Sequence, residues 1–190
     1  MNLTVRLMAS LLMLTSTVVA VAAPPEMHAP RIVKNPAFYV YADPGSRMRL
    51  NVPTGWRVRA ETLNGVRQLR IVPAKADQRE RAAIDVLVRI RPCVGNDALE
   101  RLAEKFRQAS GDREAAESVR LQSAQGRLVV EYREGSYVSN PLWIVRHHLS
   151  VYQRIDRRFL LEANCAANAS EYKTYRHNLE TICFSATAGK

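Results

Sequence analysis

The chain has 190 residues with 28 Lys or Arg against 18 Asp or Glu, which gives a formal net charge of +10 at pH 7. This length suits one domain with a single core, and the ordinary composition excludes a disordered or repetitive chain. Arginine supplies most of the positive charge, and it favours planar contacts with carboxylate or phosphate. Two interpretations stay open: the charge keeps an exported protein soluble, or it binds an acidic partner. Aromatic residues are too few for a base-stacking platform, so nucleic acid is disfavoured.

Residues 1–22 have the pattern of a secretory signal peptide. Arg6 precedes an apolar run from Leu7 to Val19, and the small residues at 20–22 fit the site that signal peptidase reads. The run is short for a bilayer, and no cysteine follows that could carry a lipid anchor. We therefore expect a protein without a membrane-spanning segment, exported to the periplasm or, without an outer membrane, secreted, whose mature chain begins near Ala23.

The mature chain divides into a lead-in and one domain. Residues 23–45 are predicted to be an extended, poorly ordered segment, because residues 23–36 contain four prolines and show no apolar period. Residues 46–186 carry strand and helix patterns throughout and form the predicted single α+β domain.

Short strands open the domain. Apolar residues at 48, 50 and 52 alternate with polar ones, and the turn at 53–55 ends this strand before Trp56. Asn64-Gly65 predicts a hairpin turn ahead of a strand at 66–72. Residues 84–91 alternate most clearly, and Pro92 ends that strand.

A helix, four strands and a second helix complete the predicted order. Asp97 and Glu100 form a capping box for a helix that ends by Gly111. Strands are predicted at 117–123, 127–134, 143–153 and 158–165, joined by tight turns into an antiparallel meander. A last helix opens at Ser170, with one apolar stripe made of Tyr172, Tyr175, Leu179, Ile182 and Cys183. This order predicts an α+β fold on a mainly antiparallel sheet with two helices.

The element order, the turn Pro53 to Trp56 and the final strand running into the last helix resemble the PsbP-like superfamily, including its bacterial DcrB-type members. The resemblance implies a compact α/β/α sandwich. It also implies a protein that holds another protein, as a subunit, assembly factor or adaptor, with no catalytic residue. The chain departs from the bacterial type because it has three cysteines and no lipoprotein cysteine.

The three cysteines, Cys93, Cys165 and Cys183, predict one disulfide and one free thiol in an oxidising compartment. A straight helix from Ser170 to Cys183 would hold Cys165 and Cys183 about 20 Å apart, beyond disulfide reach. Cys93 is therefore the expected partner of one of them. The spacing matches no zinc site, and a catalytic thiol is disfavoured.

No local motif for catalysis is present: there is no phosphate loop, nucleophile elbow or zinc-protease helix. His147 and His148 point to opposite faces of one strand, so they make a poor pair of metal ligands. Glu131 and Glu134 also fall on opposite faces. We expect no enzyme, no cofactor and no metal.

One strand face is predicted to bind a partner. By alternation, its outward residues combine positive charge with apolar side chains such as Leu87, Val129, Ile144 and Leu160, a composition typical of interfaces. Arg158 belongs to the same set. Whether this face is open or covered by a helix is left undecided. The candidate partner-binding residues are Arg89, Arg91, Arg127, Arg133, Arg146, His148 and Tyr152.

These observations favour a non-catalytic periplasmic protein that binds an acidic or partly apolar protein partner. An accessory subunit of an envelope or secretion machine and an immunity protein against a secreted toxin both fit this expectation. The alternative is a binder of anionic envelope material, such as lipid head groups or polysaccharide, held by arginine charge.

Overall fold

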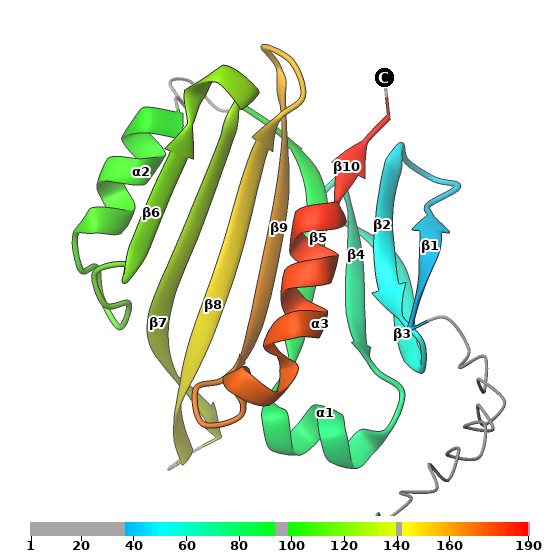
Figure 1. The fold of residues 1–190 in the computed structure, drawn as a ribbon, viewed down its shortest axis with the longest axis vertical. Helices are drawn as coiled ribbons and strands as arrows, with labels where there is room; N and C mark the ends of the chain where they lie inside the picture. The colour runs from blue at the N-terminus through cyan, green and yellow to red at the C-terminus, as the bar shows by residue number, and fades with distance from the viewer. Residues whose placement is uncertain (1–36, 94–98, 140–141, 190) are drawn as a thin grey trace, which may run out of the picture. The chain divides into compact units, whose positions relative to one another are not determined.

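The computed structural model describes residues 37–93, 99–139 and 142–189. The predicted signal peptide, the lead-in as far as residue 36 and the predicted cap at Asp97 lie outside these residues. In the described part, all strand pairs are antiparallel and they form two sheets (Figure 1). The predicted α+β fold is confirmed.

The larger sheet has seven strands and forms the frame of the fold. Most strands that are consecutive in the chain are also neighbours in this sheet. The exception is the pair β5 (Asp85–Pro92) and β6 (Ser118–Gln122), which the helix α2 (Leu99–Arg107) joins and which lie apart in the sheet. Asn64 and Gly65 both have positive φ, as the predicted hairpin turn requires. In spatial order the strands are β3 (Trp56–Leu63), β4 (Val66–Pro73), β5 (Asp85–Pro92), β9 (Phe159–Asn168), β8 (Leu142–Arg154), β7 (Arg127–Ser139) and β6 (Ser118–Gln122).

The smaller sheet consists of β1 (Phe38–Ala42), β2 (Met48–Pro53) and β10 (Thr187–Ala188). Since β1 pairs along its whole length with β2, the folded part begins before residue 46, inside the predicted lead-in. The turn after β1 is fastened to the larger sheet, because Arg67 donates two hydrogen bonds, of 2.9 and 3.1 Å, to the buried Asp43 carboxylate. These bonds hold the pKa of Asp43 below its usual value.

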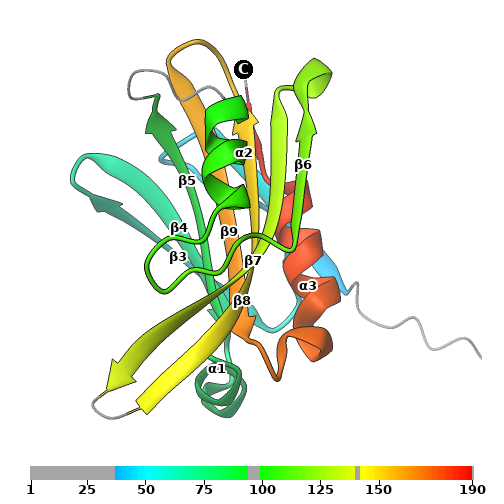
Figure 2. The same ribbon diagram turned by 90° about the vertical axis from the view of Figure 1, so that its left-hand side faces the viewer.

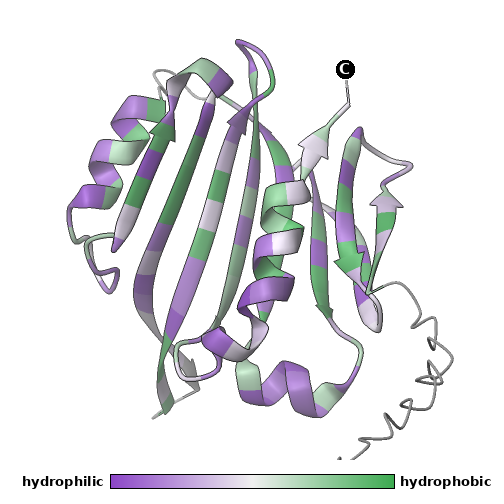
Figure 3. Cartoon of the chain, in the orientation of Figure 1, coloured by the Kyte–Doolittle hydropathy of each residue, from purple (hydrophilic) through white to green (hydrophobic). Residues whose placement is uncertain are grey.

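The main core lies between one face of the larger sheet and a layer made of α3 (Tyr172–Ser185) and the smaller sheet (Figure 1). The predicted apolar stripe of the last helix is buried here as expected. Gly55, at φ 84°, allows the turn that leads from β2 into β3, and Trp56 then packs edge-on against Tyr175 of α3. Hydrophobic bands alternate with polar bands along the strands (Figure 3).

A second core lies on the opposite face, under α2 (Leu99–Arg107), as Figure 2 shows. The helix ends at Arg107, earlier than the predicted stop near Gly111. It packs on β6 and β7, and the buried side chains of this core include Leu99, Phe106, Leu128, Val130, Tyr132, Tyr152 and Leu160. Both faces of β7 and β8 are therefore buried over part of their length.

Besides β1, two elements have no counterpart in the sequence prediction. The helix α1 (Ala76–Ala82) has four charged residues in seven and buries only Ala82, so it carries no apolar period to read. The strand β10 is two residues long and forms because it meets the edge of β2. A 3₁₀ turn, Ser123–Gln125, joins β6 to β7.

The disulfide joins Cys165 and Cys183, with Cα atoms 6.3 Å apart, and Cys93 is free. The expectation that Cys93 pairs with one of them is wrong. Cys165 lies inside β9, about 10 Å before its end, and α3 then runs back over the sheet. The rise of the helix, about 16 Å from Tyr172 to Cys183, retraces the strand and brings the two cysteines together.

Candidate functional site

The structure divides the predicted partner-binding residues between two faces of the larger sheet. Arg127 and Arg133 pair in register with Gln153 and His147, on the face that α3 covers. Arg89, Arg91 and Arg146 lie on the other face. The predicted common face is therefore wrong for β7, where Val129 packs in the α3 core and its neighbours Leu128 and Val130 in the α2 core.

Two further predicted residues are buried under the α2 layer and do not reach a partner. Tyr152 is 6% exposed and His148 is 8% exposed. His148 stacks on Tyr132 with ring centroids 4.7 Å apart, and its Nδ1 lies 3.2 Å from the Asn164 Oδ1 that accepts its hydrogen bond. Burial lowers the pKa of His148 and raises that of Tyr152. Leu160, predicted on the same outward face, belongs to this core as well.

The half of this face formed by β3, β4 and β5 remains open. α2 packs on β6 and β7, and no described helix or strand lies over the outer side of the other half (Figure 2). Leu87 and Val72 are half-buried there, among charged neighbours. We call this region the arginine surface and define it by Arg57, Arg59, Arg70, Arg89, Arg91 and Arg146.

Three acidic side chains share the arginine surface, and each is already bonded. Glu162, only 12% exposed, accepts hydrogen bonds of 3.0–3.1 Å from Arg89 and Arg91. Arg70 lies 3.3 Å from Glu61 and 3.4 Å from Asp85. Glu134, the cross-strand neighbour of Arg146, is a fourth, and six arginines against four carboxylates leave this surface with an excess of positive charge.

The excess is carried by arginines that have no acid within ion-pair distance among the described residues. Arg57 and Arg59 are exposed on β3, and Arg146 lies across the sheet on β8. The Arg146 Nε is buried without a hydrogen-bond partner in the described structure. Since an unsatisfied guanidinium N–H is costly to bury, these groups are available to an incoming carboxylate.

Part of the arginine surface is concave. A hollow of about 450 Å³ lies beside α1, with Val72, Ala83 and Ile84 as apolar lining. Arg70, Arg79 and Arg146 reach its wall together with Glu80 and Asp85. An acidic side chain with an apolar stem fits this combination of charge and apolar surface.

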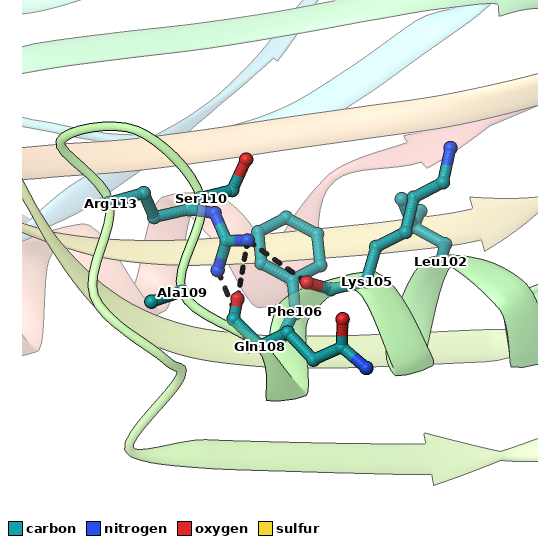
Figure 4. Close-up of a pocket in the computed structure, with 7 residues that line it drawn as sticks. All are labelled: Leu102, Lys105, Phe106, Gln108, Ala109, Ser110 and Arg113. Carbon is teal, nitrogen blue, oxygen red and sulfur yellow. Dashed lines mark hydrogen bonds between the residues drawn. The ribbon is translucent and has the colours of Figure 1, made fainter.

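Another hollow, of about 510 Å³, lies at the end of α2 and is shown in Figure 4. Its arginine is engaged in the fold. Arg113 donates to the main-chain carbonyls of Lys105, Phe106 and Gln108 at 2.8–3.3 Å, and its guanidinium lies 4.9 Å from the Phe106 ring centre. The side chain thus satisfies the last carbonyls of the helix, so its hydrogen bonds serve the fold.

The two histidines lie on opposite faces of β8, as predicted. The His147 ring stacks on the Tyr172 ring of α3 with centroids 3.8 Å apart, and its Nε2 is 3.9 Å from the Glu131 carboxylate. Burial lowers the pKa of His147 and raises that of Tyr172. Glu131 faces this layer whereas Glu134 faces His148, which confirms the prediction for the two acids. Within the described residues, no group of three acidic, His or Cys side chains has the geometry of a metal site.

Comparison with known proteins supports the fold. No family model and no curated protein matches the chain. Among solved structures, LpqN of Mycobacterium tuberculosis, described as involved in cell envelope biogenesis, matches 80% of this chain and 91% of its own, with 16% identity and a TM-score of 0.52. The solution structure of cyanobacterial PsbP from Synechocystis sp. PCC 6803 covers 86% of this chain and 99% of its own, with 17% identity and a TM-score of 0.45.

The fold of LpqN is PsbP-like, in agreement with the resemblance of the sequence. At these identities the likeness concerns the fold alone. None of the described helices combines the length and apolar character that crossing a bilayer needs.

Proposed function

We propose that this protein is an exported, non-catalytic binding protein that docks an acidic segment of a partner protein on the arginine surface. The observation that carries the proposal is the uncovered part of this sheet face, where six arginines face outward with four carboxylates. In an ordinary antiparallel sheet a solvated face is polar but mixed in charge. Here arginines outnumber carboxylates, and the hollow beside α1 supplies apolar contact area.

The arrangement favours an acidic partner for a physical reason. Arg89 and Arg91 are held by Glu162, so they are ordered before a partner arrives and lose little side-chain entropy on binding. Arg59 and Arg146 have no carboxylate of their own and gain one from the partner. An accessory subunit of an envelope machine and an immunity protein against a secreted toxin are both consistent with such a surface.

The experiment is a pull-down from envelope extract with the mature chain, beside Arg59→Glu/Arg146→Glu. These two arginines have no ion pair to lose, so the fold is expected to survive. Arg133→Glu is the control on the opposite face, where Arg133 is 48% exposed; it also breaks the 2.9 Å ion pair with Glu117, so its fold is checked by circular dichroism. We expect wild type and the control to recover the same partner in moderate salt and the double variant to lose it. Equal recovery by all three proteins would refute the proposed surface.

The second candidate is a binder of anionic envelope material through charge alone. It is favoured by the same unpaired arginines, which accept any polyanion. Binding by charge fades steeply as ionic strength rises, whereas a shape-matched interface with apolar anchors persists. Recovery of no protein by any variant, together with salt-sensitive binding to anionic polysaccharide, would select this candidate.

A further inference from the structure

The hairpin of β7 and β8 extends beyond the rest of the larger sheet (Figures 1 and 2). Pairing of β8 with β9 ends at Arg146 and Asn168, so the outer part of the hairpin is a ribbon of two strands. We call it the aromatic arm and define it by the described residues 135–137 and 142–144. Two-stranded ribbons with no covering layer expose both faces, and this one does so with apolar side chains.

The side chains of the aromatic arm are large, apolar and exposed. Tyr137 is 70% exposed, Leu142 55% and Trp143 42%. Tyr137 meets Trp143 edge-on at 4.7 Å, and the indole lies across Gly135, where a Cβ would overlap it. This packing fixes the indole against the ribbon instead of burying it in the domain. The end of β8 accordingly shows as hydrophobic in Figure 3.

Charge is absent from this stretch although it is frequent elsewhere. Residues 135–145 contain no Asp, Glu, Lys, Arg or His, in a chain of which 24% is charged. Arg133 and Arg146 stand at the base of the arm on its two faces. Two acids lie at this base: Glu134, 3.8 Å from His148, and Glu117, 2.9 Å from Arg133. An uncharged stretch with aromatic residues above a charged base matches the order of groups across a membrane interface, where Trp and Tyr lie at head-group depth.

We propose that the aromatic arm inserts into the interfacial region of an anionic lipid bilayer. The aromatic arm is apolar on both faces, with Tyr137 and Trp143 on one and Leu142 and Ile144 on the other. Lipid can surround both faces of such a ribbon, whereas a groove in a protein covers one of them. The Tyr hydroxyl and the indole N–H keep polar partners among the head groups. The net charge, +10 for the full sequence and +9 without Arg6 of the predicted signal peptide, draws the protein to an anionic surface, and the arm supplies apolar insertion that charge alone does not.

The test uses the mature chain with Trp56→Phe, so that Trp143 is the single tryptophan, and vesicles of phosphatidylcholine with phosphatidylglycerol. We expect the Trp143 emission to shift to the blue and to be quenched by lipids brominated near the head group. Tyr137→Ser/Leu142→Ser should weaken vesicle binding about ten-fold or more, because two apolar side chains no longer leave water. Leu63→Ser, at the tip of the β3–β4 hairpin and 58% exposed, is the matched control and should bind as the parent does. Binding of unsubstituted wild type shows whether Trp56→Phe has disturbed the fold.

The outcomes separate this inference from the proposed function. The arm variant should still recover the acidic partner in the pull-down, while Arg59→Glu/Arg146→Glu should not. No emission change at excess lipid would overturn the insertion of the arm. Equal vesicle binding by parent and arm variant would do the same and would leave charge as the cause. Loss of the protein partner in the arm variant would assign the arm to protein docking instead.

Discussion

His147 and His148 are neighbours in β8 but are buried in different layers. His147 packs on Tyr172 beneath α3, and His148 packs on Tyr132 on the side of α2. Desolvation lowers the pKa of both rings, although Glu131 and Glu117 act against it at His147, and Glu134 and Asn164 act against it at His148. Both rings are thus held in their neutral form in the folded protein, which makes the folded state sensitive to acid.

For His148 we predict a loss of stability as the pH falls below about 6.5, the value of an unperturbed histidine. Because the pKa of the folded state is the lower one, the unfolded chain takes up the proton first. The contribution is complete above the unfolded pKa and is lost as the pH falls through the window between the two values. His148→Gln should therefore flatten the dependence of the denaturation midpoint on pH between about 7.5 and 5.5.

The control for this measurement is His177→Gln, because His177 is exposed on α3. This variant should keep the wild-type slope. The same steep slope in His148→Gln would show that His148 does not carry the acid sensitivity. Chemical denaturation followed by circular dichroism at several pH values measures both variants.

Among the elements, β9 and α3 are held together by a disulfide as well as by buried apolar side chains. Both cysteines of the disulfide are fully buried in the main core, between the strand and the helix that covers it. Because α3 runs back over β9, the disulfide joins two cysteines that are 18 residues apart in the sequence and closes the loop between them. Closing a loop of this size stabilises the folded state by about 3 kcal/mol in the chain-entropy description.

We predict that peptide mapping without reductant finds the Cys165–Cys183 link and an alkylated Cys93. Cys165→Ala/Cys183→Ala should lower the free energy of unfolding by about 2–4 kcal/mol, and Cys93→Ser should change it far less. The two buried sulfurs should also resist reductant in the native protein. A linked peptide containing Cys93 would contradict the arrangement of β9 and α3.

Elements with a clear apolar period were predicted well from the sequence, and those without one were not. The strand at 84–91, the meander and the stripe of α3 all formed where alternation placed them. The helix α1 and the strand β10 have no such period, since contact with the rest of the fold creates them. The disulfide was missed because spacing along one helix ignores the reversal of the chain before it.

The candidate site was predicted in part, for a reason that lies in β7. Alternation fixes a strand's faces only when one of them is polar, and β7 has apolar residues at Leu128, Val129 and Val130. Because α3 covers one face of β7 and α2 covers the other, the sequence does not show which residues of β7 point to which face. Arg89, Arg91 and Arg146 were placed on the correct face because their strands keep a polar side.

At the scale of the whole domain, one sheet carries two cores. α3 and the smaller sheet cover one face and α2 covers part of the other, so β7, β8 and β9 contribute side chains to both. The arginine surface exists because α2 spans only part of its face. A further helix over β3, β4 and β5 would bury Leu87 and force the arginines of this surface to the edge.

The last prediction concerns where this domain begins. Ala37 accepts a hydrogen bond of 2.9 Å from Thr54, and β1 follows directly, so the ordered hydrogen bonding reaches back to residue 37. We expect brief trypsin treatment of the mature chain to cut after Arg31 or Lys34 and to leave the rest intact, although arginine is frequent throughout. Main-chain bonding within the sheets protects the arginines of the strands, because cleavage needs an extended, unpaired segment. Mass spectrometry of the product identifies its first residue. Early cuts between β6 and β9 would show that the meander opens more easily than this packing allows.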